Sequence, residues 1–361
     1  MKKFEHGGNI YNALKKTGQK PVLDFSANIN PLGLSLQVRR AIVSNIDNVV
    51  HYPDATACDL KENICSYYKV NEKMLVLGNG ATELLYLLCH VIRPQKVFLP
   101  VPCFSEYERA ALSCGAKVEY LFLSQTDGFH IDYLNLLAAL PDNSLVFLGN
   151  PNNPTGKLLE KQGFSEFSES LQKKNCQLVL DESFIDFLED SEERSLRNFC
   201  LEYENLFLIH SLTKFFAIPG LRLGFGLFPP VLAERLRGAT DCWNVNNLAQ
   251  AAGIAALQDC EYIKKSKFAI KQYRENFVKQ LSVCQKIKLH PSCVNFLLLN
   301  IEQTGLKAEE FCEEMAENGI LVRNCANYPG LDDNYVRVAV RSEEENEIFL
   351  NILKKVSESN G

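Results

Sequence analysis

The feature that most constrains the fold is a regular alternation of short apolar runs and longer helix-like stretches through the middle of the chain. The runs are apolar, rich in β-branched residues and almost uninterrupted, which is typical of parallel strands buried on both faces. Helix-like stretches such as Thr82–Ile92, Ser105–Cys114 and Glu160–Lys174 separate them. The alternation predicts an α/β fold with a mostly parallel sheet covered by helices. The predicted strands are Met74–Leu77, Lys96–Pro100, Lys117–Leu123, Leu145–Gly149, Gln177–Leu180, Asn205–His210 and Leu223–Phe228.

A different pattern begins near Asp241 and predicts a second, smaller α+β domain. With 361 residues, the chain is long enough for one large domain and one small domain. We expect an N-terminal arm (1–40) that packs on the small domain, a large domain (41–240) and a small C-terminal domain (241–361). The elements expected in the last part are helices at Asn247–Leu257, Glu261–Leu281 and Lys307–Asn318, and strands at Asn295–Ile301, near Ile320–Arg323 and at Tyr335–Val340.

Composition excludes several classes of protein. The net charge is −6 and no basic cluster exceeds short pairs such as Lys15–Lys16 and Lys264–Lys265, so we expect no nucleic-acid partner. We expect neither a signal peptide nor a membrane-spanning helix, because no sufficiently long apolar run is present. The thirteen cysteines are scattered without metal-site spacing, which favours reduced thiols in a cytoplasmic protein without a bound metal.

The first polar motif is Gly78–Glu83, which follows a predicted strand and opens the helix Thr82–Ile92. Glycines permit a tight turn, and the free amides at a helix N-terminus favour a phosphate group. The same residues also occur in an ordinary first helical turn. Alone, therefore, the motif is weak support for a phosphate site.

Two further motifs follow predicted strands, where parallel sheets bind their ligands. Asn150–Gly156 is either a common Pro/Gly/Asn turn or a rigid loop that directs an amide at a ligand. Asp181–Phe184 closes a buried strand with a carboxylate, which is costly unless it meets a cation or hydrogen-bond donors. A protonated pyridine nitrogen would be such a partner, whereas a helix cap or a salt bridge is the structural alternative.

The fourth motif is Ser211–Phe216, followed by Pro219–Gly224, again at a strand end. A lysine among apolar neighbours, such as Lys214, has a lowered pKa and can attack a carbonyl group. The nearby hydroxyls and Arg222 suit a phosphate. Taken alone, Lys214 would more often be a surface lysine, but four such motifs at successive strand ends favour a shared site.

In this order, the four motifs resemble the signature of fold-type-I pyridoxal 5'-phosphate (PLP) enzymes, and the resemblance extends almost from end to end. It is closest to the branch that holds histidinol-phosphate aminotransferase and threonine-phosphate decarboxylase. The resemblance implies that Lys214 carries PLP as a Schiff base, that Asp181 pairs with the pyridinium nitrogen, that Asn153 faces the phenolic oxygen and that Phe104 stacks on the ring. The implied cofactor site is completed by Gly80 and by the phosphate ligands Ala81, Thr82, Ser211, Thr213 and Arg222.

The resemblance also implies a homodimer. In this branch the tyrosine that corresponds to Tyr52, within His51–Asp54, reaches the cofactor phosphate of the partner subunit.

Three stretches and one residue resemble the decarboxylase more than the aminotransferase. The stretches are His6–Asn9, Asp24–Gly33 and Arg323–Arg341. The residue is Phe184, where the aminotransferase usually carries a tyrosine whose hydroxyl bonds the phenolic oxygen of the cofactor. The resemblance implies that Arg323 and Arg337 grip the anionic end of the substrate, and that His6, Asn30 and Asn153 complete its pocket. Arg341 either shares this role or forms a surface ion pair with Glu343 or Glu344.

The expected activity is therefore PLP-dependent decarboxylation of a small O-phosphorylated amino acid in cobamide nucleotide-loop synthesis. Lys214 is a candidate for the residue that returns a proton to Cα, but the sequence does not decide which residue does so. The substrate is L-threonine O-3-phosphate, giving 1-aminopropan-2-ol phosphate, or L-serine O-phosphate, giving ethanolamine phosphate. A pocket discriminates a single methyl group by only about 1–3 kcal/mol, so the sequence does not decide between them. The alternatives are a histidinol-phosphate aminotransferase and an inactive member of the fold with a binding or regulatory role.

Overall fold

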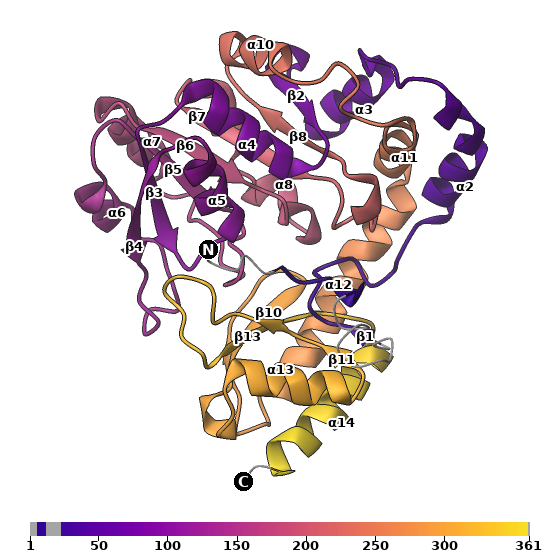
Figure 1. Cartoon of the computed structure of the whole chain (residues 1–361), viewed down its shortest axis with the longest axis vertical. Coiled ribbons are helices and arrows are strands. Elements are labelled where there is room, and N and C mark those ends of the chain that lie inside the picture. Colours follow the sequence, from indigo (N-terminus) through magenta and orange to yellow (C-terminus); the bar gives the residue numbers. More distant parts are fainter. Residues whose placement is uncertain (1–5, 12–22, 360–361) are drawn as a thin grey trace.

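The computed structural model describes residues 6–11 and 23–359, and a seven-stranded sheet forms its centre (Figure 1). The strand order is β2-β8-β7-β6-β5-β3-β4. All neighbours pair in parallel except β8, which runs antiparallel to both β2 and β7. The strands are β2 (Leu75–Gly78), β3 (Lys96–Val101), β4 (Lys117–Phe122), β5 (Ser144–Gly149), β6 (Gln177–Asp181), β7 (Leu206–Ser211) and β8 (Gly224–Leu227).

The structure confirms the predicted α/β fold, and each of the seven predicted strands is present to within one residue at either end. The predicted helices after the first two strands are also present, as α4 (Ala81–Ile92) and α5 (Ser105–Ser113). The helix predicted from Glu160 begins later, as α7 (Phe164–Lys173). Its N-cap, Gly163, has a φ of 76°, a left-handed conformation that interrupts the helical backbone ahead of Phe164.

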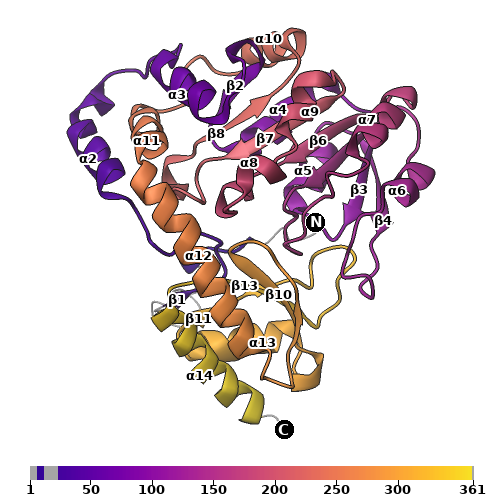
Figure 2. The same ribbon diagram turned by 180° about the vertical axis from the view of Figure 1, so that it is seen from behind.

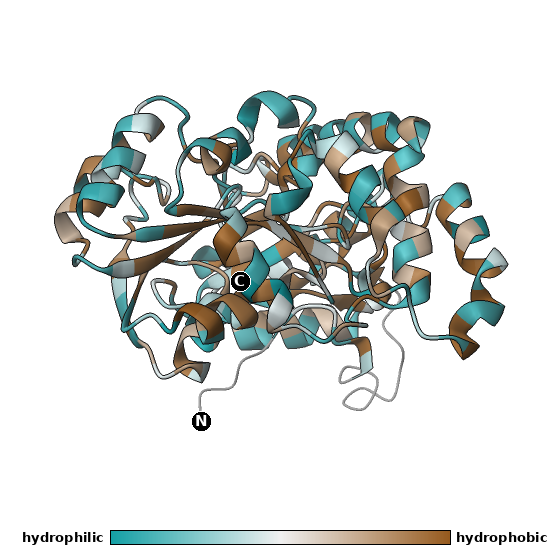
Figure 3. Cartoon of the chain, turned by 90° about the horizontal axis from the view of Figure 1, so that it is seen from above, coloured by the Kyte–Doolittle hydropathy of each residue, from teal (hydrophilic) through white to brown (hydrophobic). Residues whose placement is uncertain are grey.

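Apolar side chains cover both faces of the sheet, as expected for parallel strands. Along β7, Leu206 and Leu208 enter one core cluster, whereas Phe207 and Ile209 enter the other. Helices α4, α5 and α10 (Pro230–Gly238) cover the Phe207 side, and α3 (Cys58–Tyr68) and α7 cover the Leu206 side. Coloured by hydropathy, the strands are mostly brown, while teal residues lie mainly on outer helices and loops (Figure 3).

A smaller antiparallel sheet, ordered β12-β13-β10-β9, forms the core of the C-terminal part. The helix α14 (Glu343–Ser359), which was not predicted, packs there with α13 (Ala308–Glu317). The N-terminal segment joins this unit, because β1 (Leu23–Asp24) pairs with β11 (Ile320–Leu321) and Phe25 lies in the same core. The strands of the small sheet are β9 (Lys288–His290), β10 (Phe296–Asn300), β12 (Arg323–Asn324) and β13 (Tyr335–Ala339).

The passage between the two units runs along α12 (Cys260–Leu281), which Figure 2 shows descending from α11 to the small sheet. The preceding helix α11 (Asn247–Gln258) packs against α2 (Leu36–Ser44) and α3, with Ala249 and Ala252 in the core of the large sheet. Within α12, Ile270 belongs to that core and Phe277 to the small one. We therefore propose that the small domain begins within α12, after the predicted boundary at residue 241.

Part of the predicted arm, with Lys15 and Lys16, lies outside the described residues. Of the helices in the described ranges, none combines the length and apolar character that a membrane span requires. All thirteen cysteines are free thiols.

Candidate active site

One cavity lies at the carboxyl-terminal edge of the large sheet, and all four sequence motifs contribute residues to its walls. Its walls come from the start of α4, the start of α5, the loop after β5, the loop after β6 and the loop after β7. Ligands of parallel sheets bind at this edge. The lining residues are Ala81, Thr82, Leu85, Phe104, Tyr107, Pro151, Asn153, Asp181, Ser183, Phe184 and Lys214.

Lys214 supplies an amine to this cavity. It follows β7 between buried apolar residues, and its Nζ lies 5.2 Å from the centre of the Phe184 ring. Burial lowers the pKa of Lys214 to about 8; Asp181 opposes the shift, while Arg222 and Arg337 reinforce it. An amine of this kind is available near neutral pH as a nucleophile for a carbonyl group.

Asp181 supplies a carboxylate, and two protein donors hold it in place. The Tyr107 hydroxyl donates to Oδ2 at 2.8 Å, and the main-chain N–H of Ser183 donates to Oδ1 at 2.9 Å. The residue is 8% exposed, so its remaining acceptor capacity is directed into the cavity that it lines. A cationic ring nitrogen would complete its hydrogen bonding.

Asn153 connects the cavity to the small sheet. Its amide oxygen accepts a hydrogen bond from Nη1 of Arg337 at 2.6 Å. Because a guanidinium can only donate, this contact fixes the orientation of the amide and turns Nδ2 away from Arg337. The Asn153 amide therefore offers a donor to an oxygen atom in the cavity.

The turn before α4 and the loop after β7 form a cradle with several donors. Gly80 has a φ of 83°, and a Cβ there would lie 2.2 Å from Nη2 of Arg222. The guanidinium therefore rests against the glycine. The Ser211 and Thr213 hydroxyls lie 2.8 Å apart, and both residues are buried. Together with the first amides of α4, which have no acceptor within the helix, this set suits a phosphate.

Two buried arginines lie side by side on neighbouring strands of the small sheet. Arg323 on β12 is in register with Arg337 on β13, and they are 4% and 5% exposed. Arg337 donates to Asn153 and, through Nη2, to the Ser26 carbonyl oxygen at 2.8 Å, while Arg323 donates to Asn327 at 2.9 Å. Each guanidinium also lies near an aromatic ring, Phe296 for Arg337 and Tyr328 for Arg323.

The segment around His6 runs beside these residues. Nε2 of His6 lies 2.7 Å from Glu106 on α5, and the His6 ring centre is 5.9 Å from that of Phe104. A Cβ on Gly7 would lie 1.9 Å from the Ser26 carbonyl oxygen, so only glycine fits there. Burial would raise the pKa of Glu106, but hydrogen bonds from His6 and Tyr86 outweigh it and hold that pKa below its usual value. The segment thus links α5 to the surroundings of Arg337.

Three predicted residues lie away from the cavity. Asn30 contacts the lysine loop and α12: its Nδ2 donates to the Phe215 carbonyl oxygen and to Ser266, each at 2.8 Å. Tyr52 is 77% exposed and stacks on Trp243 with ring centres 4.3 Å apart. Arg341 pairs with Glu345 at 3.0 Å, not with Glu343 or Glu344.

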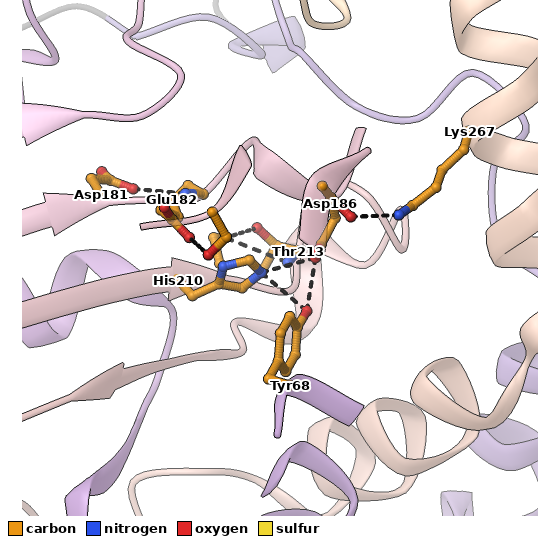
Figure 4. A network of polar contacts seen from close by, with 11 residues as sticks. Tyr68, Asp181, Glu182, Asp186, His210, Thr213 and Lys267 are labelled. Atoms are coloured by element: carbon orange, nitrogen blue, oxygen red, sulfur yellow. Dashed lines mark hydrogen bonds and ion pairs between the residues drawn. The ribbon is translucent and has the colours of Figure 1, made fainter. Parts of the chain in front are cut away.

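A polar network that was not predicted supports the sheet edge. Glu182 accepts hydrogen bonds from Ser195, from the Leu196 amide and from Asn150, and thereby holds the start of the loop that carries Asn153. Burial raises the pKa of Glu182. Figure 4 shows Glu182 beside Asp181, and a second group of Tyr68, Asp186 and His210 close by. The sequence did not predict these contacts, because the polar residues that form them are scattered among apolar runs.

Comparisons with known proteins identify relatives along nearly the whole chain. The threonine-phosphate decarboxylase of Salmonella typhimurium is 36% identical over 97% of this chain and 96% of its own length. An adenosylcobalamin biosynthesis bifunctional protein of Leptospira interrogans is also 36% identical, over 98% of this chain and 41% of that longer protein. The solved histidinol-phosphate aminotransferase of Clostridium acetobutylicum is 33% identical, with a TM-score of 0.85 over 94% of this chain and 100% of the solved chain.

The family model Aminotransferase class I and II matches residues 20–353. That range contains the lysine, the carboxylate, the cradle and both arginines. The chain therefore belongs to the aminotransferase class I and II family, whose enzymes depend on PLP.

Proposed function

We propose that the protein is a PLP-dependent decarboxylase of a small O-phosphorylated amino acid. The proposed substrate is L-threonine O-3-phosphate, giving 1-aminopropan-2-ol phosphate for the nucleotide loop of a cobamide; L-serine O-phosphate, giving ethanolamine phosphate, is the second candidate. Support comes from the relatives in Salmonella typhimurium and Leptospira interrogans, and from the chemistry of the cavity. The free cysteines support a reducing compartment, which we propose is the cytoplasm.

The residues of the cavity fit PLP group by group. Lys214 offers an amine for the aldehyde carbon, Asp181 a carboxylate for the ring nitrogen, and Asn153 an amide donor for the phenolic oxygen. Phe104 offers a ring face. The cradle of Gly80 and Arg222, which a Cβ would fill, fits a phosphate, together with Ala81, Thr82, Ser211 and Thr213.

When bound, PLP supplies a conjugated ring that accepts the electron pair of a broken bond at Cα. The chain then has three tasks. Asp181 would accept a hydrogen bond from the protonated ring nitrogen, and a protonated ring accepts the electron pair more readily. Arg323 and Arg337 hold the anionic end of the substrate and thereby decide which Cα bond is aligned for cleavage. Lys214 is the base in the cavity that would hold the proton for Cα.

The surroundings of Arg337 support an anionic substrate. Among the described residues no carboxylate lies within ion-pair distance of it, and its Nε has no hydrogen-bond partner. A buried guanidinium without a counter-ion is costly, and a phosphate or a carboxylate would relieve that cost bidentately. The hydrogen bond from Arg337 to Asn153, which lines the cavity together with Lys214, supports this role.

Phe184 favours decarboxylation over transamination. Its ring lies beside the amine of Lys214 and brings no hydroxyl to the cavity. The resemblance associates a tyrosine at this place with the aminotransferase and a phenylalanine with the decarboxylase. The phenolic oxygen of the cofactor would then rely on Asn153, without a second donor from position 184.

We also propose a homodimer that buries the surface around Tyr52. Large apolar side chains are exposed over α2, the following 3-10 helix (Ile46–Val50) and the adjacent loop, and Trp243 extends this surface. Asn247 holds the loop by donating to the carbonyl oxygens of Asn48 and His51 at 2.7 and 2.9 Å. A second copy would cover the exposed residues Leu36, Val43, Ile46, Val49, Val50 and Tyr52. Sedimentation equilibrium of the wild type and of Tyr52→Asp measures the oligomeric state. A monomeric wild type would refute the proposed dimer.

Product analysis tests the proposed activity. The holoenzyme is incubated with L-threonine O-3-phosphate without a keto acid, and in parallel with histidinol phosphate and 2-oxoglutarate. We expect 1-aminopropan-2-ol phosphate from the first mixture and no product from the second. Loss of the amine that requires 2-oxoglutarate would instead identify an aminotransferase. Lys214→Ala is the control, because it should abolish either activity.

A further inference from the structure

Tyr107 contacts Asp181 and, like Lys214, lines the cavity. It lies on α5 and is 2% exposed. Its hydroxyl donates to Oδ2 of Asp181 at 2.8 Å, while the Ser183 amide donates to Oδ1. Each carboxylate oxygen therefore already accepts one hydrogen bond before any ligand is considered.

Two aromatic contacts fix the direction of this hydroxyl. The Tyr107 ring stacks on Phe147, with centres 5.2 Å apart and an angle of 13° between the planes. It also meets Phe104 edge to face, at 5.6 Å and 88°. A phenol held on two sides has little rotational freedom, so its donor stays aimed at Asp181. The same ring thereby positions both the carboxylate and the aromatic face offered to the cofactor.

We propose that Tyr107 is a positioning residue: its hydrogen bond to Asp181 orients the carboxylate towards the ring nitrogen of bound PLP and thereby keeps the shared proton on that nitrogen. A hydrogen bond donated to a carboxylate stabilises its charged form and lowers its affinity for a proton. Without that donor, the proton shared by the ring nitrogen and the carboxylate would shift towards Asp181. An unprotonated ring accepts electrons less readily. The proposal rests on PLP binding as proposed above, and not on the identity of the amino-acid substrate.

The phenol is suited to act as a constant donor. Burial raises the pKa of Tyr107 well above its usual value, and the charge of Asp181 raises it further. The hydroxyl therefore keeps its proton throughout the range in which an enzyme of this kind works. Its role is to donate, not to exchange a proton.

Tyr107→Phe removes the hydroxyl and retains the ring with its two aromatic contacts. The matched control is Tyr68→Phe, because the Tyr68 hydroxyl donates to another buried carboxylate, that of Asp186, at 2.7 Å (Figure 4). Tyr68 is also 2% exposed and does not line the cavity. The two substitutions thus delete similar bonds, and only one of those bonds involves Asp181.

The readout is the ¹⁵N chemical shift of PLP labelled at the ring nitrogen and bound to each variant, together with steady-state kinetics. For Tyr107→Phe we expect the shift to move towards that of an unprotonated pyridine. We expect kcat to fall by about 10- to 100-fold, the range for one hydrogen bond to a charged group, with little change in KM. Tyr68→Phe should leave the shift at the wild-type value.

A Tyr107→Phe spectrum identical to that of the wild type would overturn the proposal, as would an equal change in Tyr68→Phe. If Tyr107→Phe does not bind PLP, replacement of Tyr107 by 4-aminophenylalanine decides the question. The aniline N–H is a weaker donor on the same ring, so the shift should move towards the unprotonated value, and no movement would refute the role. The ¹⁵N shift is measured without substrate, so it remains decisive even if the enzyme does not decarboxylate threonine phosphate.

Discussion

The main-chain N–H of Asn30 donates a hydrogen bond to the carbonyl oxygen of Lys214, with the two atoms 3.0 Å apart. The Asn30 side chain donates to the next carbonyl, that of Phe215, and to Ser266 on α12. Three segments therefore meet at one asparagine: the N-terminal arm, the lysine loop and the helix that joins the two units. The position of the reactive amine depends on all three.

Asn30→Ala is expected to lower the free energy of unfolding by about 1–3 kcal/mol, because it leaves the buried Phe215 carbonyl and Ser266 hydroxyl without their donor. Chemical denaturation measures the change. Asn45→Ala, which removes a partly buried bond to Ala41 in a helix cap, is the control and should cost less. An Asn30→Ala enzyme with unchanged stability but a raised KM would show instead that Asn30 contacts the substrate, as the sequence predicted.

Gly80→Ala is expected to weaken PLP binding at least tenfold. The added methyl group would meet the Arg222 guanidinium, and the left-handed backbone at Gly80 disfavours alanine. Displacing a charged donor from a phosphate costs about 1.5–3 kcal/mol, and each 1.4 kcal/mol is a factor of ten in affinity. Titration of the apoenzyme with PLP measures the dissociation constant. Gly220→Ala, where a Cβ meets nothing within 4 Å, should bind PLP like the wild type.

The uptake of PLP by the apoenzyme is expected to depend on pH with a midpoint near 8. Burial lowers the pKa of Lys214 to about 8, and only the neutral amine attacks an aldehyde. The rate should therefore rise with pH and level off above this value. Asp181→Asn removes the charge that opposes the shift, so its midpoint should move to lower pH. Stopped-flow absorbance follows the reaction, and a midpoint near the ordinary lysine value of 10.5 would contradict the assignment.

Arg337→Lys is expected to reduce kcat/KM by about ten- to a hundredfold, since a lysine cannot reach Asn153, Ser26 and an anion at once. Arg341→Lys is the matched control. Arg341 pairs with Glu345 one helical turn away, in a partly exposed contact that contributes little. Equal losses in the two variants would mean that Arg337 has no special part in holding the substrate.

The alternation of apolar runs predicted the large sheet to within a residue, because a strand buried on both faces must be apolar along its whole length. Lys214, Asp181 and Asn153 were predictable for the same reason, since they directly follow such strands. The structure brings all three to one cavity.

Tyr107 and the placement of Asn30 were not predictable from the sequence. Tyr107 stands three residues after Phe104, a spacing that puts both on one side of a helix start, but only the tertiary fold brings its hydroxyl to Asp181. Asn30 lies in a polar segment whose residues have no periodicity. Its partners Phe215 and Ser266 are far away in the sequence, so nothing local indicates that it supports the lysine loop.

The most direct test of the proposed activity follows the carboxyl carbon. L-Threonine O-3-phosphate labelled with ¹³C at the carboxylate is mixed with the holoenzyme in a sealed cell without any keto acid. We expect one equivalent of labelled CO2 for each equivalent of 1-aminopropan-2-ol phosphate, and none with Lys214→Ala. Retention of the label in an organic acid, together with a requirement for 2-oxoglutarate, would contradict it.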